Sequence, residues 1–302
     1  MASSEPGASS EPGASSEPGA SSEPGAGTVL EDGNHELRYS PATGPIADTT
    51  IRTGSEGLDT RLTPIGAGNR AVRVYAAWPK ASQNAPVMLV ISEAFGLHAH
   101  IADVARRFAY HGYFAVAPDL IARQGDPMRY DNVGMLVKEL LLKIPDPQVM
   151  SDLDATVAWA ASQGGDTGQL AATGFCWGGR WTWLYAAHRS LRAAVVLYGI
   201  IDGAGTFPLD PALFPRHPLD VTNDLKGPVL GLYGGKDEAI SPASIDAMRT
   251  KLREGNAAAR ASEIHVYHDA PHAFFADYRD SYRTADATDA WSRCLGWFAE
   301  RI

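Results

Sequence analysis

Cys176 stands at the centre of the pentapeptide GFCWG, positions 174–178, and this setting indicates chemistry. A β-rich apolar run over 170–173 precedes the motif, and the helical pattern RWTWLYAAH follows shortly after it. A Gly-x-nucleophile-x-Gly motif between a strand and a helix forms a sharp, strained turn that projects its central side chain. The helix N-terminus also favours the thiolate, which is the attacking form of cysteine. A lone cysteine is more often buried and structural, but this context predicts a nucleophile at Cys176.

Asp237 and His272 could activate this cysteine, because a cysteine nucleophile needs a base and a group that orients the base. Asp237 lies in a loop after the apolar run 229–233, and His272 lies in a loop after the run 263–267. Taken singly, such an aspartate is more often a turn or cap residue, and such a histidine is more often solvated. The chain order nucleophile, acid, histidine is nonetheless that of the α/β-hydrolase fold. The three residues together predict a Cys-His-Asp triad.

The loop after the apolar run 87–91 supplies a further candidate, Glu93, in the segment SEAFGL. A glutamate at the start of a loop is usually solvated. Here we expect the loop to face Cys176 across the sheet. Its backbone N–H groups and that of Trp177 could then form an oxyanion hole, which stabilises the negative charge that develops on a carbonyl oxygen under attack.

The elements that must position these residues alternate between short β-rich runs and longer helical patterns. The strands are expected at residues 72–76, 87–91, 114–117, 170–173, 193–198, 229–233 and 263–267. The helices are expected at residues 101–110, 133–142, 152–161, 179–188, 242–253 and 285–301. This alternation predicts an α/β fold, with a mostly parallel sheet covered by helices on both faces. In such a sheet, functional groups gather beyond the carboxyl ends of the strands, where all the candidates lie.

The composition disfavours nucleic-acid-binding, membrane-spanning and disulfide-rich secreted proteins. The chain has 302 residues and a net charge of −9, and four of its carboxylates lie in four copies of the hexapeptide ASSEPG near the N-terminus. The mild acidity gives no support to nucleic-acid binding, and no apolar run is long enough to cross a membrane. The sequence has only two cysteines and begins without the pattern of a secretory signal. We therefore expect a cytoplasmic protein without a disulfide scaffold.

The chain is expected to have three parts. Residues 1–27, which hold the repeat, lack large apolar side chains and are expected to be a disordered tail. Residues 28–68 are expected to be an irregular N-terminal extension, because their apolar residues show little periodicity. Residues 69–302 are expected to be a single α/β-hydrolase domain.

Residues 72–302 resemble the dienelactone hydrolase family, also called the carboxymethylenebutenolidases. The resemblance rests on the segments ISEAFGLHAHI, GYFAVAPDLIARQGD, DLDATVAW, GFCWGGR, GGKDEAIS and DAPHAFF. The pairing of a Glu-x-Phe-Gly loop with a Gly-x-Cys-x-Gly-Gly motif is far more specific than a hydrolase motif alone. The resemblance implies the α/β-hydrolase fold and a hydrolase of lactones or small esters.

The resemblance also implies roles for individual residues. Cys176 would be the nucleophile, and Asp237 and His272 would complete the triad. Glu93 would meet the thiol in the resting enzyme until substrate displaces it. The oxyanion hole would consist of the N–H groups of Trp177 and Ala94, and the reaction would pass through an acyl-thioester that water hydrolyses.

One departure from the family bears on the substrate. The resemblance implies two arginines that hold a substrate carboxylate, one of them four residues after the catalytic histidine, where this sequence has Ala276. This departure argues against dienelactone as the natural substrate. The candidate substrate-binding residues are Arg123, Arg129, Arg279, Phe95 and Phe274.

Two alternatives to a hydrolase are compatible with the same sequence. The fold could serve a non-catalytic protein, or Cys176 could be a redox-sensing thiol, although Cys294 is a poor candidate for a resolving cysteine. His98 and His100 lack a third ligand nearby, so no metal is expected. The Gly-rich stretches 164–165 and 234–235 lack the lysine and Ser/Thr of a P-loop, so no nucleotide cofactor is expected either. The expected partner is a small ester or lactone, with no nucleic acid and no membrane, and the protein is expected to be a monomer or small homo-oligomer.

Overall fold

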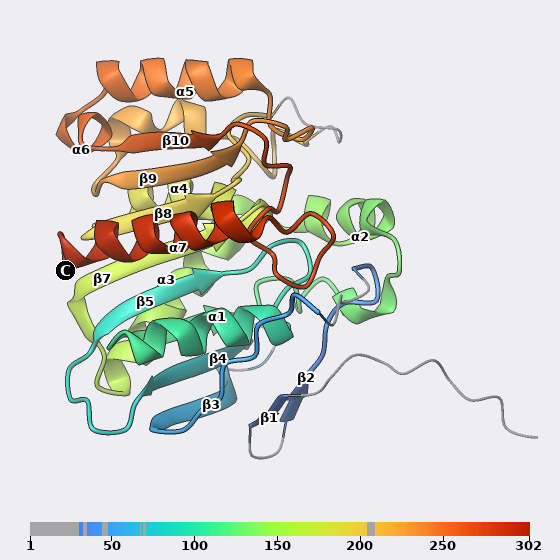
Figure 1. The fold of residues 1–302 in the computed structure, drawn as a ribbon, viewed down its shortest axis with the longest axis vertical. Helices are drawn as coiled ribbons and strands as arrows, with labels where there is room; N and C mark the ends of the chain where they lie inside the picture. The colour runs from blue at the N-terminus through green and yellow to red at the C-terminus, as the bar shows by residue number, and fades with distance from the viewer. Residues whose placement is uncertain (1–29, 33–34, 44–47, 67, 69–70, 204–208) are drawn as a thin grey trace, which may run out of the picture.

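A mostly parallel sheet forms the centre of the protein (Figure 1). The candidate residues Glu93, Cys176, Asp237 and His272 follow the carboxyl ends of four of its strands. The computed structural model describes residues 30–32, 35–43, 48–66, 68, 71–203 and 209–302, so the tail expected at 1–27 lies outside the described residues. Within these ranges eight strands pair in the order β10-β9-β8-β7-β5-β6-β4-β3. They are β3 (Leu58–Ile65), β4 (Val72–Pro79), β5 (Pro86–Ile91), β6 (Phe114–Pro118), β7 (Asp166–Phe175), β8 (Ala193–Leu197), β9 (Val229–Gly234) and β10 (Glu263–Tyr267).

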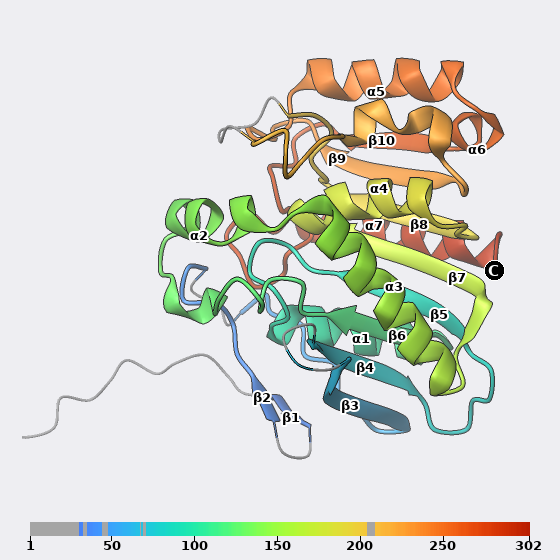
Figure 2. The same cartoon turned by 180° about the vertical axis from the view of Figure 1, so that it is seen from behind.

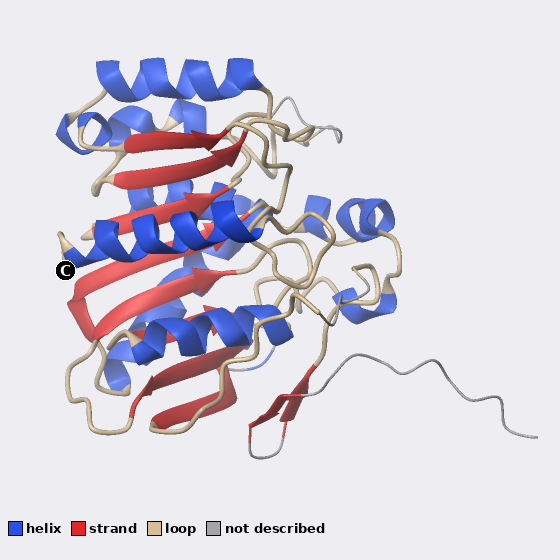
Figure 3. Ribbon diagram, viewed as in Figure 1, coloured by secondary structure: helices blue, strands red, loops and turns tan. Residues whose placement is uncertain are grey.

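Strand direction explains why one edge of the sheet can hold a site. Strands β5 to β10 pair in parallel, whereas β4 is antiparallel to both β3 and β6. The arrowheads of β5, β7, β8, β9 and β10 therefore point to the same side of the molecule (Figure 3). The loops after these strands meet there, as expected for an open parallel sheet.

Helices cover both faces of this sheet. They are α1 (Ala99–Tyr110), α2 (Val133–Glu139), α3 (Asp146–Ser162), α4 (Trp177–His188), α5 (Pro242–Glu254), α6 (Ala257–Arg260) and α7 (Thr284–Ala299). Helices α1 and α7 lie on the face seen in Figure 1, and α3 and α4 lie on the opposite face, seen in Figure 2. Burial on both sides explains why β6 and β8 consist entirely of buried apolar residues.

The predicted α/β fold is confirmed, and the predicted strands and helices are present with small shifts at their ends. The largest shift is in α3, which begins at Asp146 rather than at Asp152. Pro147 lies in its first turn, where the missing N–H of a proline costs no helical hydrogen bond. None of the helices in the described part of the chain has both the length and the apolar character that crossing a bilayer requires.

The segment 28–68, expected to be irregular, contributes strands. Strand β3 pairs along its whole length with β4 and forms one edge of the sheet. Strands β1 (Leu30–Asp32) and β2 (His35–Leu37) form a separate antiparallel pair. The sequence LDTRLTPI lacks the apolar signal of a core strand because β3 is an edge strand, and its residues between Leu58 and Ile65 are partly buried or exposed.

Candidate active site

Cys176 lies on the tight turn between β7 and α4. Its backbone has φ 51° and ψ −114°, a strained conformation for a residue with a side chain, and its N–H donates to the Leu197 carbonyl oxygen at 3.0 Å. A side chain at Gly178 would collide with the carbonyl oxygens of Ile91 and Ser92, at the end of the neighbouring β5. The glycine thus lets the helix start directly against the sheet, and this close packing fixes the position of Cys176.

Gly178→Ala should therefore destabilise the protein by about 2 kcal/mol, because the added methyl group must displace backbone atoms. Urea unfolding measures this difference. Gly296→Ala in α7 is the matched control, since a methyl group there meets no atom within 4 Å and should leave stability unchanged or slightly higher. Equal stability of both variants would contradict the packing role of Gly178.

His272 and Asp237 form the second part of the site. Nδ1 of His272 lies 2.8 Å from Oδ2 of Asp237, and the aspartate is buried. Oδ1 of Asp237 accepts hydrogen bonds from the N–H groups of Ala239 at 2.8 Å and Ile240 at 3.1 Å. The aspartate is thus held in place by its own loop and orients the imidazole through Nδ1, which leaves Nε2 for chemistry.

The charges around His272 favour its protonated form. Burial of the ring lowers its pKa, but the Cys176 sulfur and the Asp237 carboxylate outweigh burial and raise the pKa of His272 to about 10. The arrangement therefore suits an imidazolium at His272, between the Cys176 sulfur and the Asp237 carboxylate.

Glu93 has a different partner from the one expected. Its Oε1 atom accepts hydrogen bonds from Nε2 of His98 at 2.7 Å and from the Tyr278 hydroxyl at 2.6 Å. Its buried Oε2 atom has no hydrogen-bond partner among the described residues, so the expected bond to the Cys176 thiol is not formed. Burial raises the pKa of Glu93, but His98, with smaller effects from His100 and Tyr278, lowers it to about 2.

A cavity of about 120 Å³ connects these side chains. It is lined by Glu93, Ala94, Phe95, Val133, Cys176, Tyr198, His272, Ala273, Ala276, Tyr278 and Arg279. The cavity therefore brings together Cys176, its histidine and the loop that starts at Glu93. The oxyanion-hole candidates, the N–H groups of Ala94 and Trp177, come from this loop and from the first turn of α4.

Only some of the candidate substrate-binding residues line the cavity. Arg279 and Phe95 line the cavity, with the guanidinium carbon 5.7 Å from the centre of the Phe95 ring. Phe274 is instead a core residue that packs against Tyr198 and Tyr267. The expectation that Phe274 lines the pocket is wrong, because the turn after His272 directs this ring into the core.

The other two arginines lie outside the cavity. Arg123 forms an ion pair with the buried carboxylate of Asp152. Arg129 lines a different cavity of about 720 Å³, beside the ion pair of Arg73 and Asp119. Spacing along the chain could not distinguish these roles, because both arginines belong to the connection between β6 and α2, which has no regular apolar pattern.

Three residues of the site escaped the sequence interpretation. Tyr198 follows β8 directly, so the rule that identified Asp237 and His272 could have found it. The sequence around His98 suggests at most a metal ligand, and no motif marks Tyr278. Both become recognisable only through the fold, which brings them together at Glu93.

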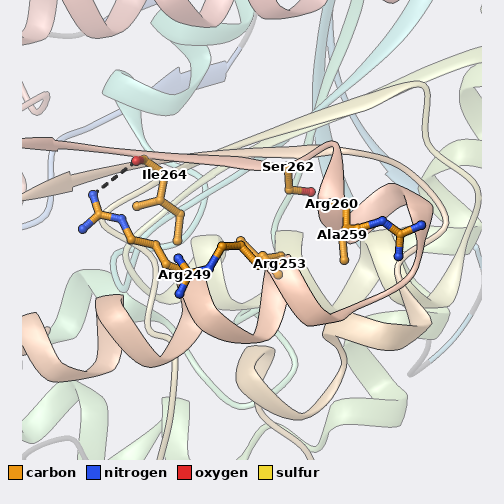
Figure 4. A pocket seen from close by; sticks show the side chains of 7 residues that line it. Arg249, Arg253, Ala259, Arg260, Ser262 and Ile264 are labelled. Carbon is orange, nitrogen blue, oxygen red and sulfur yellow. Dashed lines mark hydrogen bonds between the residues drawn. The ribbon is translucent and has the colours of Figure 1, made fainter.

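A basic groove elsewhere does not belong to this site. It has a volume of about 320 Å³, and its lining includes Arg249, Arg253 and Arg260 (Figure 4). Arg249 donates to the Ile264 carbonyl oxygen at 3.3 Å, and the guanidinium groups of Arg249 and Arg260 lie at opposite ends of the groove (Figure 4). The groove borders the amino-terminal half of β10, whereas His272 follows its carboxyl end.

Comparisons with known proteins show the family of the chain. A sequence model of the dienelactone hydrolase family matches residues 72–302. A protein from Salmonella typhimurium provisionally named carboxymethylenebutenolidase is 47% identical over 269 residues, which are 88% of this chain and 96% of that protein. A relative with the same provisional name from Escherichia coli is 46% identical over 87% of this chain and 94% of its own length.

Solved structures give the same result for the fold. The crystal structure of a provisionally named dienelactone hydrolase from Klebsiella pneumoniae is 47% identical, with a TM-score of 0.75 over 80% of this chain and 99% of that chain. An acylaminoacyl peptidase from Pyrococcus horikoshii, at 13% identity and a TM-score of 0.62, shares the fold alone. With the matching family model and these relatives, the chain belongs to the dienelactone hydrolase family.

Proposed function

We propose that the protein hydrolyses small esters or lactones through a covalent intermediate on Cys176. The observation that carries this proposal is the alignment of Asp237, His272 and Cys176 beside one small cavity. The aspartate orients the imidazole, and the imidazole stands next to the sulfur, which is the arrangement required for nucleophilic catalysis. The provisional names of the relatives support the same reaction class.

In the first half of the reaction, the Cys176 thiolate attacks the carbonyl carbon of the substrate. The carbonyl oxygen becomes negative and accepts hydrogen bonds from the N–H groups of Ala94 and Trp177. The C–O bond to the leaving group then breaks, and the His272 imidazolium gives its proton to the departing oxygen. A lactone would open in this step and stay attached through its acyl carbon as a thioester.

In the second half, water hydrolyses the thioester. Acylation removes the charge on the Cys176 sulfur, which is one of the groups that keep His272 protonated, so the ring can now accept a proton. His272 takes a proton from water as the oxygen attacks the acyl carbon, the C–S bond breaks, and the thiolate returns. The net reaction is ester plus water to acid plus alcohol.

Arg279 is the proposed anchor for a negatively charged group on the substrate. It is the single arginine or lysine among the described residues that line the cavity, and it lies three residues after Ala276. A charge-assisted hydrogen bond from a guanidinium to a carboxylate contributes about 1.5 to 3 kcal/mol. A substrate that carries a carboxylate near its ester bond fits this feature best.

Arg279→Gln should raise KM about tenfold for an ester that carries a carboxylate and leave KM for a neutral ester nearly unchanged. Steady-state kinetics on a matched pair of such esters measures the split. Arg253→Gln, in the basic groove at the other end of the sheet, is the control and should affect neither ester. An equal effect of Arg279→Gln on both esters would contradict the anchoring role.

The experiment that tests the proposed function is hydrolysis of dienelactone and p-nitrophenyl acetate side by side, with Cys176→Ala as the blank. Cys176-dependent turnover of either compound would support the proposal. Turnover of the simple ester alone would indicate the same chemistry with a different acyl pocket, as Ala276 suggests. Turnover that persists unchanged in the blank would contradict it.

A further inference from the structure

Arg279 belongs to a loop that forms one wall of the cavity. The residues of this loop that line the cavity are His272, Ala273, Ala276, Tyr278 and Arg279. Two turns shape the loop, because the N–H of Ala276 donates to the Ala273 carbonyl oxygen and the N–H of Arg279 donates to that of Ala276, each at 3.0 Å. No carboxylate among the described residues pairs with the Arg279 guanidinium, which packs against the Phe95 ring instead. The position of this guanidinium therefore depends on what holds the loop.

Asp277 lies in the same loop but contacts α1 instead of the cavity. It is fully buried, and its Oδ2 atom accepts a hydrogen bond from Nη2 of Arg107 at 2.6 Å. Nδ1 of His100, also in α1, lies 3.4 Å from Oδ1 of Asp277. Burial raises the pKa of Asp277, but His100 and Arg107 outweigh burial and lower it, so the carboxylate is ionised. A buried, charged contact thus ties the loop to α1.

The N-terminal extension braces this contact from a second side. Arg107 donates through Nε to Oδ1 of Asp103, one turn earlier in α1. Asp103 also accepts hydrogen bonds from the N–H of Thr53 at 2.5 Å and from its hydroxyl at 3.2 Å. A second threonine of the extension, Thr49, donates its hydroxyl to the Asp277 carbonyl oxygen at 2.5 Å. The segment that carries both threonines therefore connects α1 to the loop, although it precedes the region that matches the family model.

We propose that Asp277 is a positioning residue for Arg279, the proposed anchor for a substrate carboxylate, and this inference rests on that proposed function. The Asp277 carboxylate fixes the loop two residues before Arg279, so the guanidinium is in place at the cavity before substrate binds. Binding a carboxylate then costs less conformational entropy than it would on a loose loop. His272 is held separately by Asp237, so the reaction of a neutral ester does not depend on Asp277.

Asp277→Asn tests the proposal, because asparagine keeps the size of the side chain and removes its charge. KM for an ester that carries a carboxylate should rise about fivefold, while its kcat and both constants for a neutral ester stay within about twofold of wild type. Steady-state kinetics on the matched pair of esters measures this split. Asp152→Asn is the matched control, since Asp152 is also a buried aspartate paired with an arginine but lies outside the cavity. It should lower stability without changing the ratio of the two KM values.

A double variant shows whether Asp277 acts through Arg279. In an Arg279→Gln protein there is no anchor left to position, so adding Asp277→Asn should raise KM for the charged ester by less than about twofold. Thr49→Val removes one hydroxyl from the loop and no charge, so it should raise this KM about twofold and decides the question if Asp277→Asn does not fold. An unchanged KM for the charged ester in both Asp277→Asn and Thr49→Val would overturn the proposal. An equal rise for both esters, or an undiminished rise in the Arg279→Gln protein, would overturn it too.

Binding of benzoate, a carboxylate without an ester bond, lets this proposal and the proposed function fail separately. Isothermal titration calorimetry should give a Kd for benzoate about fivefold higher in Asp277→Asn than in wild type, and Arg279→Gln should weaken binding at least as much. These losses without any ester turnover would sustain the positioning role and contradict the hydrolase mechanism. Normal turnover of both esters, with KM and benzoate binding insensitive to Asp277, would do the reverse.

Discussion

Cys176→Ala should lower kcat/KM for ester hydrolysis by about ten-thousand-fold or more while the protein stays folded. The sulfur is the nucleophile in the proposed reaction, and alanine leaves no group that could form the acyl intermediate. The turn at Cys176 is held by glycines and by a backbone bond to Leu197, neither of which needs the side chain. Hydrolysis of p-nitrophenyl acetate, with thermal unfolding measured in parallel, tests the prediction.

Cys294→Ala is the matched control for this experiment. Cys294 is the other cysteine of the chain and is buried in α7, where burial raises the pKa of its thiol. The control should cost some stability through lost packing but leave kcat/KM near the wild-type value. Full activity in Cys176→Ala would contradict the triad, whatever Cys294→Ala does.

His272→Gln should lower kcat/KM by about a thousandfold and also slow the alkylation of Cys176 at neutral pH. The imidazolium is the positive partner of the Cys176 sulfur, and because the pKa of His272 is about 10 this charge is present at pH 7 and is lost only as the pH rises toward 10. Glutamine has neither the charge nor a group that can exchange a proton with substrate. Both chemical steps and the reactivity of the free thiol should therefore fall together.

Measuring both ester turnover and Cys176 alkylation distinguishes the loss of a catalytic group from a general disturbance of the site. A variant that merely loosened the site would lose turnover but make Cys176 more accessible to iodoacetamide. His268→Gln, at an exposed position four residues earlier, should change neither rate. An unchanged rate of Cys176 alkylation across pH 5 to 9 in His272→Gln would contradict the pairing of a protonated His272 with the Cys176 sulfur.

The strands and helices near the site were predictable because they are buried on both faces or follow strong periodic patterns. Strand β8, for example, is the uninterrupted apolar run AAVVL, and β10 has the predicted bounds. Strand β3 was not predictable, because an edge strand needs few apolar residues. Its extended conformation depends on backbone hydrogen bonds to β4, which leave no pattern in its own sequence.

The positions of the predicted triad were accessible from sequence for a topological reason. Residues that follow parallel strands meet at one edge of the sheet, so Cys176, Asp237 and His272 could be grouped without knowing any distance. The partners of Glu93 were not accessible in this way. His98 and Tyr278 meet Glu93 only because two loops and α1 pack together in three dimensions.

The candidate substrate-binding arginines also could not be told apart from the sequence. Arg123 and Arg279 were equally good candidates as isolated charges, but a buried ion pair with Asp152 occupies Arg123. Only the packed structure distinguishes an arginine that stabilises the fold from one that faces a cavity.

A covalent thioester on Cys176 is the step on which the proposed mechanism depends, and mass spectrometry of wild-type protein quenched with acid during turnover of p-nitrophenyl acetate tests it. We expect an added acetyl group on the peptide that contains Cys176, absent from the Cys176→Ala protein and lost when the intact enzyme is left to complete turnover. Continued turnover with no acyl group on Cys176, or with the acyl group on another residue, would contradict the thioester mechanism.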